Sequence, residues 1–221
     1  MFTITLDGPS ASGKSTVADI GAKKLKINHL NSGEFYRAIT LYMLRKKIKT
    51  DDFKQINHEL PNINIEVKFL GEKQIMILNG EDVSELLHSN EVNATVSNYS
   101  HNEEVVKKAS ELTYLATKSH NLIIDGRNVG SFVLPNAECK IYLDCDAKIR
   151  AERRFKEQIE KGAKVTFEEI YKQTLERDEL DRTRKIAPLV VPKDAIIITS
   201  DAKTPEDLAD EIIKIVLSQK S

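Results

Sequence analysis

Nine residues near the start of the chain have the types and spacing of a phosphate-binding loop, G-x-x-x-x-G-K-[ST]. They are Gly8, Pro9, Ser10, Ala11, Ser12, Gly13, Lys14, Ser15 and Thr16. A glycine-rich turn at the start of a helix directs several backbone N–H groups toward bound phosphates, and the helix dipole adds positive potential there. Lys14 can then reach the β- and γ-phosphates, and Ser15 can ligate Mg²⁺. The pattern predicts a site for a nucleoside triphosphate, with Mg²⁺ as its cofactor.

A tight turn that merely contains glycine and lysine is the alternative explanation of this segment. However, the strand-like run at residues 2–7 comes directly before the loop, and a segment that can be helical follows it. Phosphate-binding loops lie in this strand–loop–helix context. The order of the elements therefore favours phosphate binding over a plain turn.

The arginines of the chain are unevenly distributed. Six of the nine fall within residues 150–184, at positions 150, 153, 154, 177, 182 and 184. Guanidinium groups bind planar oxyanions through two parallel hydrogen bonds. For any single arginine, a solvated helix face with neighbouring glutamates explains the residue as well. For the whole cluster, in a chain with a phosphate-binding loop, anion binding is the favoured interpretation.

Asp125-Gly126-Arg127 ends an expected strand and carries a second signal. Asp125 can hold Mg²⁺ directly or through water. A motor ATPase usually has Asp-Glu at this place and a GTPase needs Asn-Lys-x-Asp, and the sequence contains neither motif in these roles. Arg127 would bind a second anion instead of activating water, which favours a kinase over an ATPase.

Strand-like segments that are apolar without alternation recur along the chain. Such segments are typical of parallel strands buried on both faces by helices. The expected strands cover residues 2–7, 121–125, 140–144 and 195–199, with a short fifth one at 27–30. We therefore expect an α/β fold with a parallel five-stranded sheet and helices on both faces. Thr204-Pro205 is expected to begin the last helix.

The segment 50–100 has a different pattern. Residues 63–69 alternate between apolar and polar, residues 71–73 can turn the chain, and residues 74–80 return. This is the pattern of an antiparallel hairpin with one exposed face. We expect a small β insert beside the main sheet.

Between residues 147 and 187, two charged helical stretches flank a short segment that contains Gly162. They carry few large apolar residues, so they are poor candidates for the core. A charged helical hairpin beside a phosphate site is typical of a lid that closes and excludes water. The sequence predicts one domain, 1–221, with an insert at 50–100 and a lid at 147–187.

Composition excludes several classes of protein. Of its 221 residues, 40% are hydrophobic and 30% are charged, which is typical of a globular protein. The net charge of −1 gives no indication of a basic surface that would bind nucleic acid or an anionic membrane. The chain shows no apolar run of membrane-spanning length and no leader pattern, so we expect a cytoplasmic protein. Nothing in it demands more than a monomer.

Cys139 and Cys145 would lie about 20 Å apart along a strand, too far for a disulfide. The five histidines lack metal-ligand spacing.

The chain resembles bacterial cytidylate kinases over nearly its whole length. The segments that carry the resemblance, in order, are Gly8–Thr16, Asn31–Arg37, Gly80–Ser84, Asp125–Arg127 and Glu176–Arg184. The third and fifth are far more specific than the phosphate loop. The resemblance implies a P-loop kinase fold, Mg-ATP as the phosphate donor, and CMP or dCMP as the acceptor.

The resemblance also implies roles for single residues. The implied acceptor-binding residues are Ser32, Tyr36, Arg37, Ser97, Arg127, Asn128, Asp181 and Arg184. Arg37, Arg127 and Arg184 would bind the acceptor phosphate, and Asp181 would take a ribose hydroxyl. The implied catalytic residues are Lys14, Arg127, Arg177 and Arg184, of which Arg177 would face the bridge between donor and acceptor. The implied metal site consists of Ser15 and Asp125.

Three lid arginines resemble those that reach the ATP phosphates: Arg150, Arg153 and Arg154. We assign Arg150 and Arg154 to ATP together with Gly8–Thr16, and expect at least one of the three arginines to be only solvated. Asp7, just before the loop, is expected to be structural.

The sequence departs from the family pattern where the base is recognised. Asn128 stands where the family has an aspartate that accepts from the cytosine amine, and Val106 stands in the register of a base-recognising arginine. An amide oxygen still accepts a hydrogen bond, but without charge assistance. Weak discrimination among CMP, dCMP and UMP is therefore an open hypothesis.

Two other classes of function remain to be compared with a CMP kinase. An adenylate- or shikimate-type kinase shares the phosphate loop, but the Gly80–Ser84 segment and the β insert argue against it. A nucleotide switch or DNA-linked ATPase would need a partner surface or a basic groove, and the sequence indicates neither.

Overall fold

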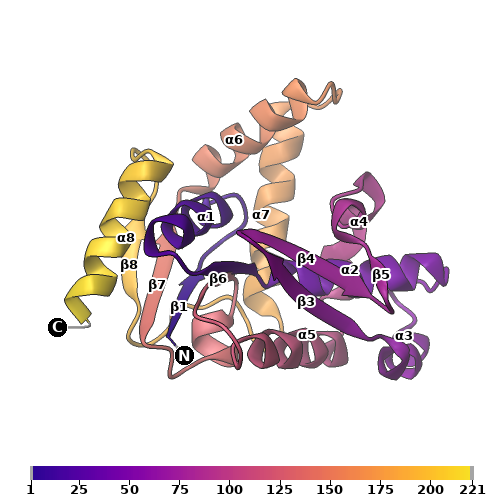
Figure 1. The fold of residues 1–221 in the computed structure, drawn as a ribbon. Helices are drawn as coiled ribbons and strands as arrows, with labels where there is room; N and C mark the ends of the chain where they lie inside the picture. The colour runs from indigo at the N-terminus through magenta and orange to yellow at the C-terminus, as the bar shows by residue number, and fades with distance from the viewer. Residues whose placement is uncertain (1, 220–221) are drawn as a thin grey trace.

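A five-stranded sheet forms the centre of the molecule (Figure 1). The computed structural model describes residues 2–219, so residues 1, 220 and 221 of the expected 1–221 domain lie outside the described part. The strand order is β2-β6-β1-β7-β8, and every neighbouring pair is parallel. The strands are β1 (Thr3–Asp7), β2 (Asn28–Asn31), β6 (Leu122–Gly126), β7 (Cys139–Asp144) and β8 (Ile196–Thr199). The five strands predicted from the apolar runs are confirmed.

Helices cover both faces of this sheet, as predicted. On one face, α1 (Lys14–Leu25) and α8 (Pro205–Gln219) bury the apolar side chains of β1, β6 and β7. On the other face, α2 (Gly33–Arg45) and α5 (Glu103–Ala116) pack over Leu30, Leu122 and Ile124. Because apolar side chains point to both faces of the sheet, β6 begins Leu-Ile-Ile and β8 begins Ile-Ile-Ile without alternation, whereas the edge strand β2 is mostly polar.

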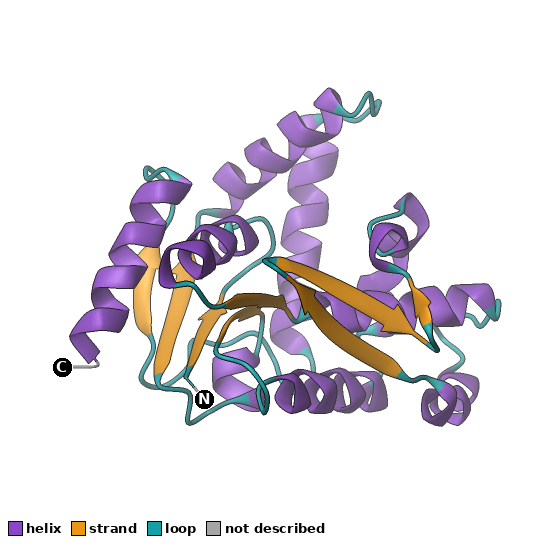
Figure 2. Ribbon diagram, viewed as in Figure 1, coloured by secondary structure: helices purple, strands orange, loops and turns teal. Residues whose placement is uncertain are grey.

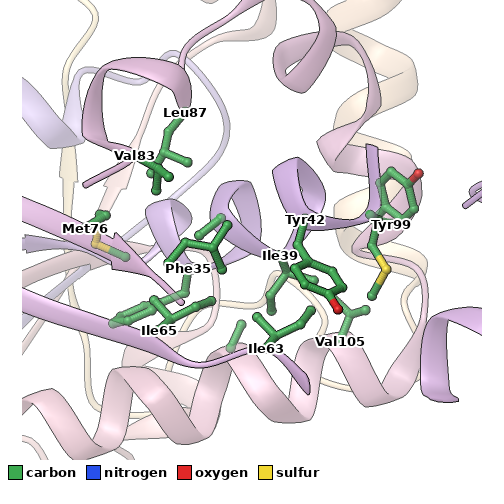
Figure 3. Packing of buried hydrophobic residues seen from close by; sticks show 14 of the residues in the cluster. Phe35, Ile39, Tyr42, Ile63, Ile65, Met76, Val83, Leu87, Tyr99 and Val105 are labelled. Carbon is green, nitrogen blue, oxygen red and sulfur yellow. The ribbon is translucent and has the colours of Figure 1, made fainter. Parts of the chain in front are cut away.

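A second sheet lies beside α2 (Figure 2). Its antiparallel strands β3 (Ile65–Leu70) and β4 (Lys73–Leu78) confirm the predicted hairpin, and a two-residue strand β5 (Glu81–Asp82) adds to β4. Figure 3 shows Ile65 and Met76 of this sheet meeting Phe35 of α2 within one buried cluster. The second sheet therefore shares the core of the main sheet.

The remaining elements surround these two sheets. The structure describes short helices before and after the strands of the insert. They are α3 (Phe53–Glu59), η1 (Leu60–Asn62), η2 (Ser84–Leu86) and α4 (Asn90–Tyr99), with η3 (Val129–Val133) after β6.

The two helices α6 (Ala147–Glu160) and α7 (Phe167–Thr183) form a hairpin that projects from the sheet (Figure 1). Gly162 has φ +77° at the bend, and a capping box between Thr166 and Glu169 begins α7. Whether this hairpin closes as a lid, and whether the 50–100 segment acts as an insert of a single domain, stay predictions.

Two smaller observations complete the fold. Within residues 2–219, no helix combines the length and apolar character needed to cross a membrane. Cys139 and Cys145 are both buried free thiols.

Candidate active site

The phosphate loop connects β1 to α1 along the carboxyl end of the sheet. A Cβ atom on Gly8 would lie 2.3 Å from the carbonyl oxygen of Leu143, so no side chain fits at this position. Gly13 has φ +92°, a left-handed conformation that favours glycine. The Ser200 hydroxyl, which follows β8, donates to the carbonyl of Ser12 at 3.0 Å. The loop is thus shaped by two glycines and held from the neighbouring strands.

Lys14 lies inside this loop and is only 4% exposed. Its ammonium group donates to the carbonyl of Pro9 at 2.6 Å and to the hydroxyl of Ser12 at 3.2 Å. Burial lowers the pKa of Lys14 well below its usual value, and the positive charge of Arg127 adds to that effect. The lysine therefore lies close enough to Arg127 for the two cations to repel each other. An anion between them would relieve that repulsion.

The predicted metal ligands lie together. The Ser15 hydroxyl donates to Oδ2 of Asp125 at 2.7 Å, and His29 Nε2 lies 2.7 Å from Oδ1 of the same carboxylate. Burial alone would raise the pKa of Asp125, but the hydrogen bond and charge of His29 and the bond from Ser15 hold it below its ordinary value. A hydroxyl and an ionised carboxylate are hard oxygen donors, so this pair fits Mg²⁺. Sequence reasoning missed His29, which the parallel pairing of β2 with β6 brings to Asp125.

Three arginines meet at one buried carboxylate, and we call this group the arginine cluster. Asp181 on α7 accepts from Arg127 Nε at 3.0 Å and from Arg177 Nε at 3.4 Å, and Arg184 Nη2 lies 3.9 Å away. Burial would raise the pKa of Asp181, but the three guanidinium charges hold it below its usual value. Three cations with one anion leave an excess of two positive charges in a site that is mostly closed to water.

Arg184 has unused hydrogen-bonding capacity. Its side chain is 6% exposed, and its Nε and Nη2 atoms have no hydrogen-bond partner among the described residues. Buried polar groups in folded proteins nearly always have partners. Apart from the contact of Nη2 with Asp181 at 3.9 Å, these two atoms are available to a ligand.

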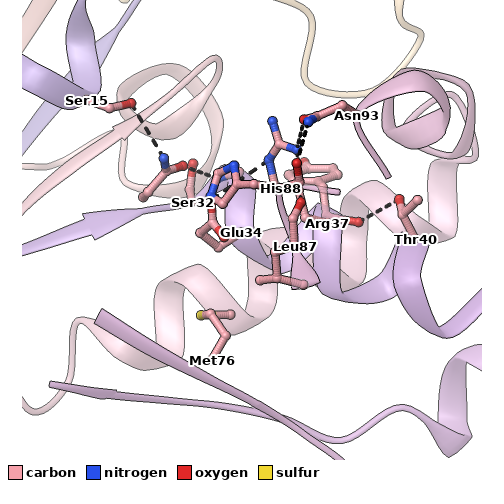
Figure 4. Close-up of polar contacts among 12 residues, drawn as sticks. Ser15, Ser32, Glu34, Arg37, Thr40, Met76, Leu87, His88 and Asn93 are labelled. Atoms are coloured by element: carbon pink, nitrogen blue, oxygen red, sulfur yellow. Dashed lines mark hydrogen bonds and ion pairs between the residues drawn. The ribbon is translucent and has the colours of Figure 1, made fainter. Parts of the chain in front are cut away.

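Arg37, which is expected to bind the acceptor phosphate, lies on α2 and contacts Leu87 and Asn93 (Figure 4). Its Nη1 donates to the carbonyl of Leu87 at 3.2 Å and to Oδ1 of Asn93 at 2.6 Å. Burial lowers the pKa of Arg37, and the charges of Arg127 and Arg154 lower it further. Arg37 therefore lies near Arg127 and Arg154; its role at the acceptor phosphate and the role of Arg154 at ATP stay predictions.

Arg177 connects the helical hairpin to the insert. Its Nη1 donates to the hydroxyl of Ser97 on α4, while its Nε remains on Asp181. The two predicted site residues Arg177 and Ser97 are thus in direct contact. Ser32, also predicted for the acceptor, is buried and donates to the backbone carbonyl of Asp125 at 2.8 Å.

Two positions that depart from the family pattern at the base, Asn128 and Val106, lie on the segment after β6 and on α5, whereas Ser97, the base-recognising residue that keeps the pattern, lies on α4. Asn128 is 4% exposed, and the hydroxyl of Tyr36 is buried beside it. Val106 is 2% exposed on α5. Ser110, one helical turn after Val106, also lies beside Tyr36 and was not identified from the sequence.

The three lid arginines have different surroundings. Arg150 is 2% exposed and forms two hydrogen bonds to Asp178 of α7, while its Nε donates to the carbonyl of Cys145 at 3.0 Å and its Nη1 to that of Ser10 at 3.2 Å. Each of its three nitrogen atoms thus donates to a protein acceptor. This placement supports a role in joining the helical hairpin to the phosphate loop, and its assignment to ATP stays a prediction.

Arg153 lies against the other end of the phosphate loop. Its Nη2 donates to the carbonyl of Ser200 at 2.7 Å, and Ser200 in turn holds Ser12. Arg154 acts through its charge on Arg37 and Arg177, so it lies on the side of the hairpin that faces the arginine cluster.

Asp7 is fully buried and structural, as expected. Its carboxylate accepts from the backbone N–H groups of Val129 at 2.9 Å and Gly130 at 2.6 Å, which fixes the turn that carries Arg127 and Asn128. Burial raises its pKa to about 6, although the two N–H donors and the charges of Lys14 and Arg127 lower it.

This raised pKa predicts a pH-dependent stability. The folded protein binds the Asp7 proton more tightly than the unfolded chain, whose reference pKa is 3.8. The stabilisation is therefore complete below that value and is lost as the pH rises through about 6. We expect the wild type to lose free energy of unfolding relative to an Asp7→Asn variant between pH 4 and 6.5. Urea unfolding at both pH values measures this difference, and a constant difference would contradict it.

Comparison with known proteins identifies the family. The sequence model of the family described as cytidylate kinase matches residues 4–218. The cytidylate kinase of Caldicellulosiruptor saccharolyticus is 38% identical over 214 residues, which cover 97% of this chain and 95% of that protein. The cytidylate kinase of Thermotoga maritima is 36% identical over 215 residues, with 97% and 96% covered.

Solved structures support the fold. The crystal structure of shikimate kinase from Bacteroides thetaiotaomicron matches with a TM-score of 0.53 and 11% identity, and the match covers 97% of this chain and 98% of that one. At this identity the likeness concerns the fold alone, and the predicted P-loop kinase fold is confirmed. The family match along residues 4–218 and the two relatives at 36–38% identity show that the chain belongs to the cytidylate kinase family.

Proposed function

We propose that this protein transfers the γ-phosphate of ATP to CMP or dCMP, producing ADP and CDP or dCDP. The observation that carries the proposal is the arginine cluster, in which one carboxylate is shared by three guanidinium groups beside Lys14. The phosphate loop accounts for one polyanion. The excess positive charge of the arginine cluster and the Nε and Nη2 atoms of Arg184, which lack hydrogen-bond partners among the described residues, favour a second bound anion.

Phosphoryl transfer to CMP requires no covalent intermediate with the protein. An oxygen of the acceptor phosphate is already a nucleophile, so no general base is required. The obstacles are the repulsion between two anions and the charge that spreads over the transferring phosphoryl group. Lys14 would hold the donor phosphates, while Arg37, Arg127 and Arg184 would hold the acceptor phosphate in line with them. Fixed cations in a site poor in water lower the barrier because they need not reorganise during the reaction.

Mg²⁺ completes the proposed set of charges. Ser15 and Asp125 would hold the ion, which would neutralise charge on the donor phosphates when bound. Asp181, flanked by cations, remains ionised and can accept a hydrogen bond from a ribose hydroxyl.

The helical hairpin of α6 and α7 would close over both nucleotides. Arg154 and Arg177 lie on these helices, so closure would bring their charges to the bridge between donor and acceptor. Exclusion of water would direct the phosphoryl group to the acceptor rather than to hydrolysis. We expect the enzyme to act as a monomer in the cytoplasm.

A panel of acceptors tests the proposed function. ADP release is measured by a coupled assay with ATP and Mg²⁺, in the presence of CMP, dCMP, UMP or AMP and without any acceptor. We expect turnover with CMP and dCMP and almost none without acceptor. A Lys14→Ala protein purified in the same way gives the background from contaminating kinases. ADP release that is independent of acceptor would indicate an ATPase, and a response to AMP alone would indicate an adenylate-type kinase.

A further inference from the structure

The edge strand β2 is polar, although it belongs to the main sheet. Its residues are Asn28, His29, Leu30 and Asn31. Leu30 packs under α2, so His29 and Asn31, its neighbours in the chain, point to the opposite face of the sheet, which α1 covers. Ser15 lies in the first turn of α1. Two polar side chains of β2 are therefore on the same face of the sheet as the predicted metal ligands.

His29 and Asn31 contact the two predicted ligands separately. Nε2 of His29 lies 2.7 Å from Oδ1 of Asp125, and the amide of Asn31 donates to the hydroxyl of Ser15 at 3.5 Å. Ser15 in turn donates to Oδ2 of Asp125 at 2.7 Å. An ionised carboxylate carries no proton, so Nε2 of His29 is the donor in its contact with Asp125. The carboxylate thus has one hydrogen-bond donor on each of its oxygens.

These two donors fix the rotation of the Asp125 carboxylate. An ionised carboxylate has about four lone pairs, so each oxygen keeps one for a further donor or for a cation. The charge of Lys14 also acts on Asp125, and a carboxylate that was free to rotate could turn an oxygen toward that ammonium group. His29 holds Oδ1, and this keeps Oδ2 beside Ser15.

The pairing of β2 with β6 does not depend on this hydrogen bond. The backbone register already extends from Asn28 opposite Leu122 to Asn31 opposite Asp125. The side chains of His29 and Asp125 are only 14% and 5% exposed, so water weakens their contact little. Proteins commonly orient the carboxylates of metal sites by such hydrogen bonds from a residue behind them.

We propose that His29 is a positioning residue, whose Nε2–H group orients the Asp125 carboxylate for the Mg²⁺ that accompanies the donor nucleotide. This inference rests on the proposed function, because it concerns the metal ligands of the same donor site. His29 acts only through Asp125. A neutral imidazole with its proton on Nε2 is sufficient for this role.

Equilibrium binding of ADP with and without Mg²⁺ tests the role of His29. Calorimetric titration gives the dissociation constant of ADP in excess Mg²⁺ and in excess EDTA. We expect His29→Leu to weaken ADP binding by about tenfold in Mg²⁺ but by less than about twofold in EDTA. His29→Gln keeps an N–H donor near the position of Nε2, so it should stay within about threefold of the wild type in both conditions.

His58→Leu is the matched control for these variants. His58 lies on α3 with a side chain that is 79% exposed, so its replacement should leave both dissociation constants unchanged. An equal loss with and without Mg²⁺ in His29→Leu, or no loss in either condition, would overturn the inference. If His29→Leu does not fold, His29→Asn gives the same comparison, because its side chain is too short to reach Asp125. A wild type that binds ADP with Mg²⁺ but shows no turnover with any acceptor would instead overturn the proposed function.

Discussion

An Arg184→Ala variant is expected to lose about a hundred- to thousandfold in kcat/KM for phosphoryl transfer to CMP. Arg184 has two buried nitrogen atoms without partners, so its donors are available to an anion that carries charge in the transition state. The free energy of unfolding should change little, because Asp181 keeps Arg127 and Arg177 as partners and the mutual repulsion of three cations decreases. The coupled ADP assay measures the first quantity and urea unfolding the second.

Arg182→Ala is the matched control for this variant. Arg182 lies two residues earlier and is exposed, so its removal deletes an arginine without touching the cluster. We expect less than about a threefold change in kcat/KM, since solvated charges act weakly. If Arg184→Ala behaved like Arg182→Ala, Arg184 would have no part in catalysis.

Replacement of Arg150 by alanine is expected to act mainly on stability. The change would leave Asp178 buried without its cation and would free the carbonyl groups of Ser10 and Cys145. Removing one partner of a buried ion pair typically costs about 3–5 kcal/mol of unfolding free energy. Urea unfolding should show this loss. Michaelis constants for ATP should rise as well, because Ser10 belongs to the phosphate loop.

A double variant separates this structural role from direct ATP binding. Arg150→Met with Asp178→Leu replaces the ion pair by apolar groups, which is often neutral for stability. We expect most of the lost stability to return. If Arg150→Ala instead unfolded like the wild type and raised only the Michaelis constant for ATP, Arg150 would be a phosphate ligand, as the sequence cluster suggests.

The elements that could be predicted from the sequence are those whose local hydrophobic pattern reflects their burial, namely the parallel strands and the hairpin. The expected bounds of the five parallel strands agree with the structure within one or two residues, and the central strands β1 and β6 are buried along their whole length. The alternating run gives the hairpin of β3 and β4. The two-residue strand β5 (Glu81–Asp82) is too short and polar to show a period, so only its pairing with β4 reveals it.

Partners far apart in the sequence could not be predicted in the same way. Arg150 and Arg154 look alike within one helix, and only the packing of α7 shows that Arg150 meets Asp178, 28 residues later. His29 has no spacing signal, because its partner Asp125 belongs to a neighbouring strand.

The acceptor side shows the same limit. The family pattern alone shows that Asn128 and Val106 depart from the residues usually found at these positions. It does not show which side chains surround them. Ser110 lies in an ordinary amphipathic helix, and only the packing of α5 against α2 shows that its hydroxyl lies beside that of Tyr36.

The position of β1 in the sheet has a consequence for how the protein is made on the ribosome. β1 is among the first segments to be synthesised, yet its neighbours are β6 and β7, so Thr3 pairs with Leu122 and Ile4 with Cys139. The complete phosphate loop therefore leaves the exit tunnel of the ribosome long before Leu143 and Ser200 have been translated. These two residues shape the loop and hold it in place. In a nascent chain the phosphate loop is present but cannot adopt its folded conformation. Nucleotide binding therefore requires that nearly the whole polypeptide has emerged.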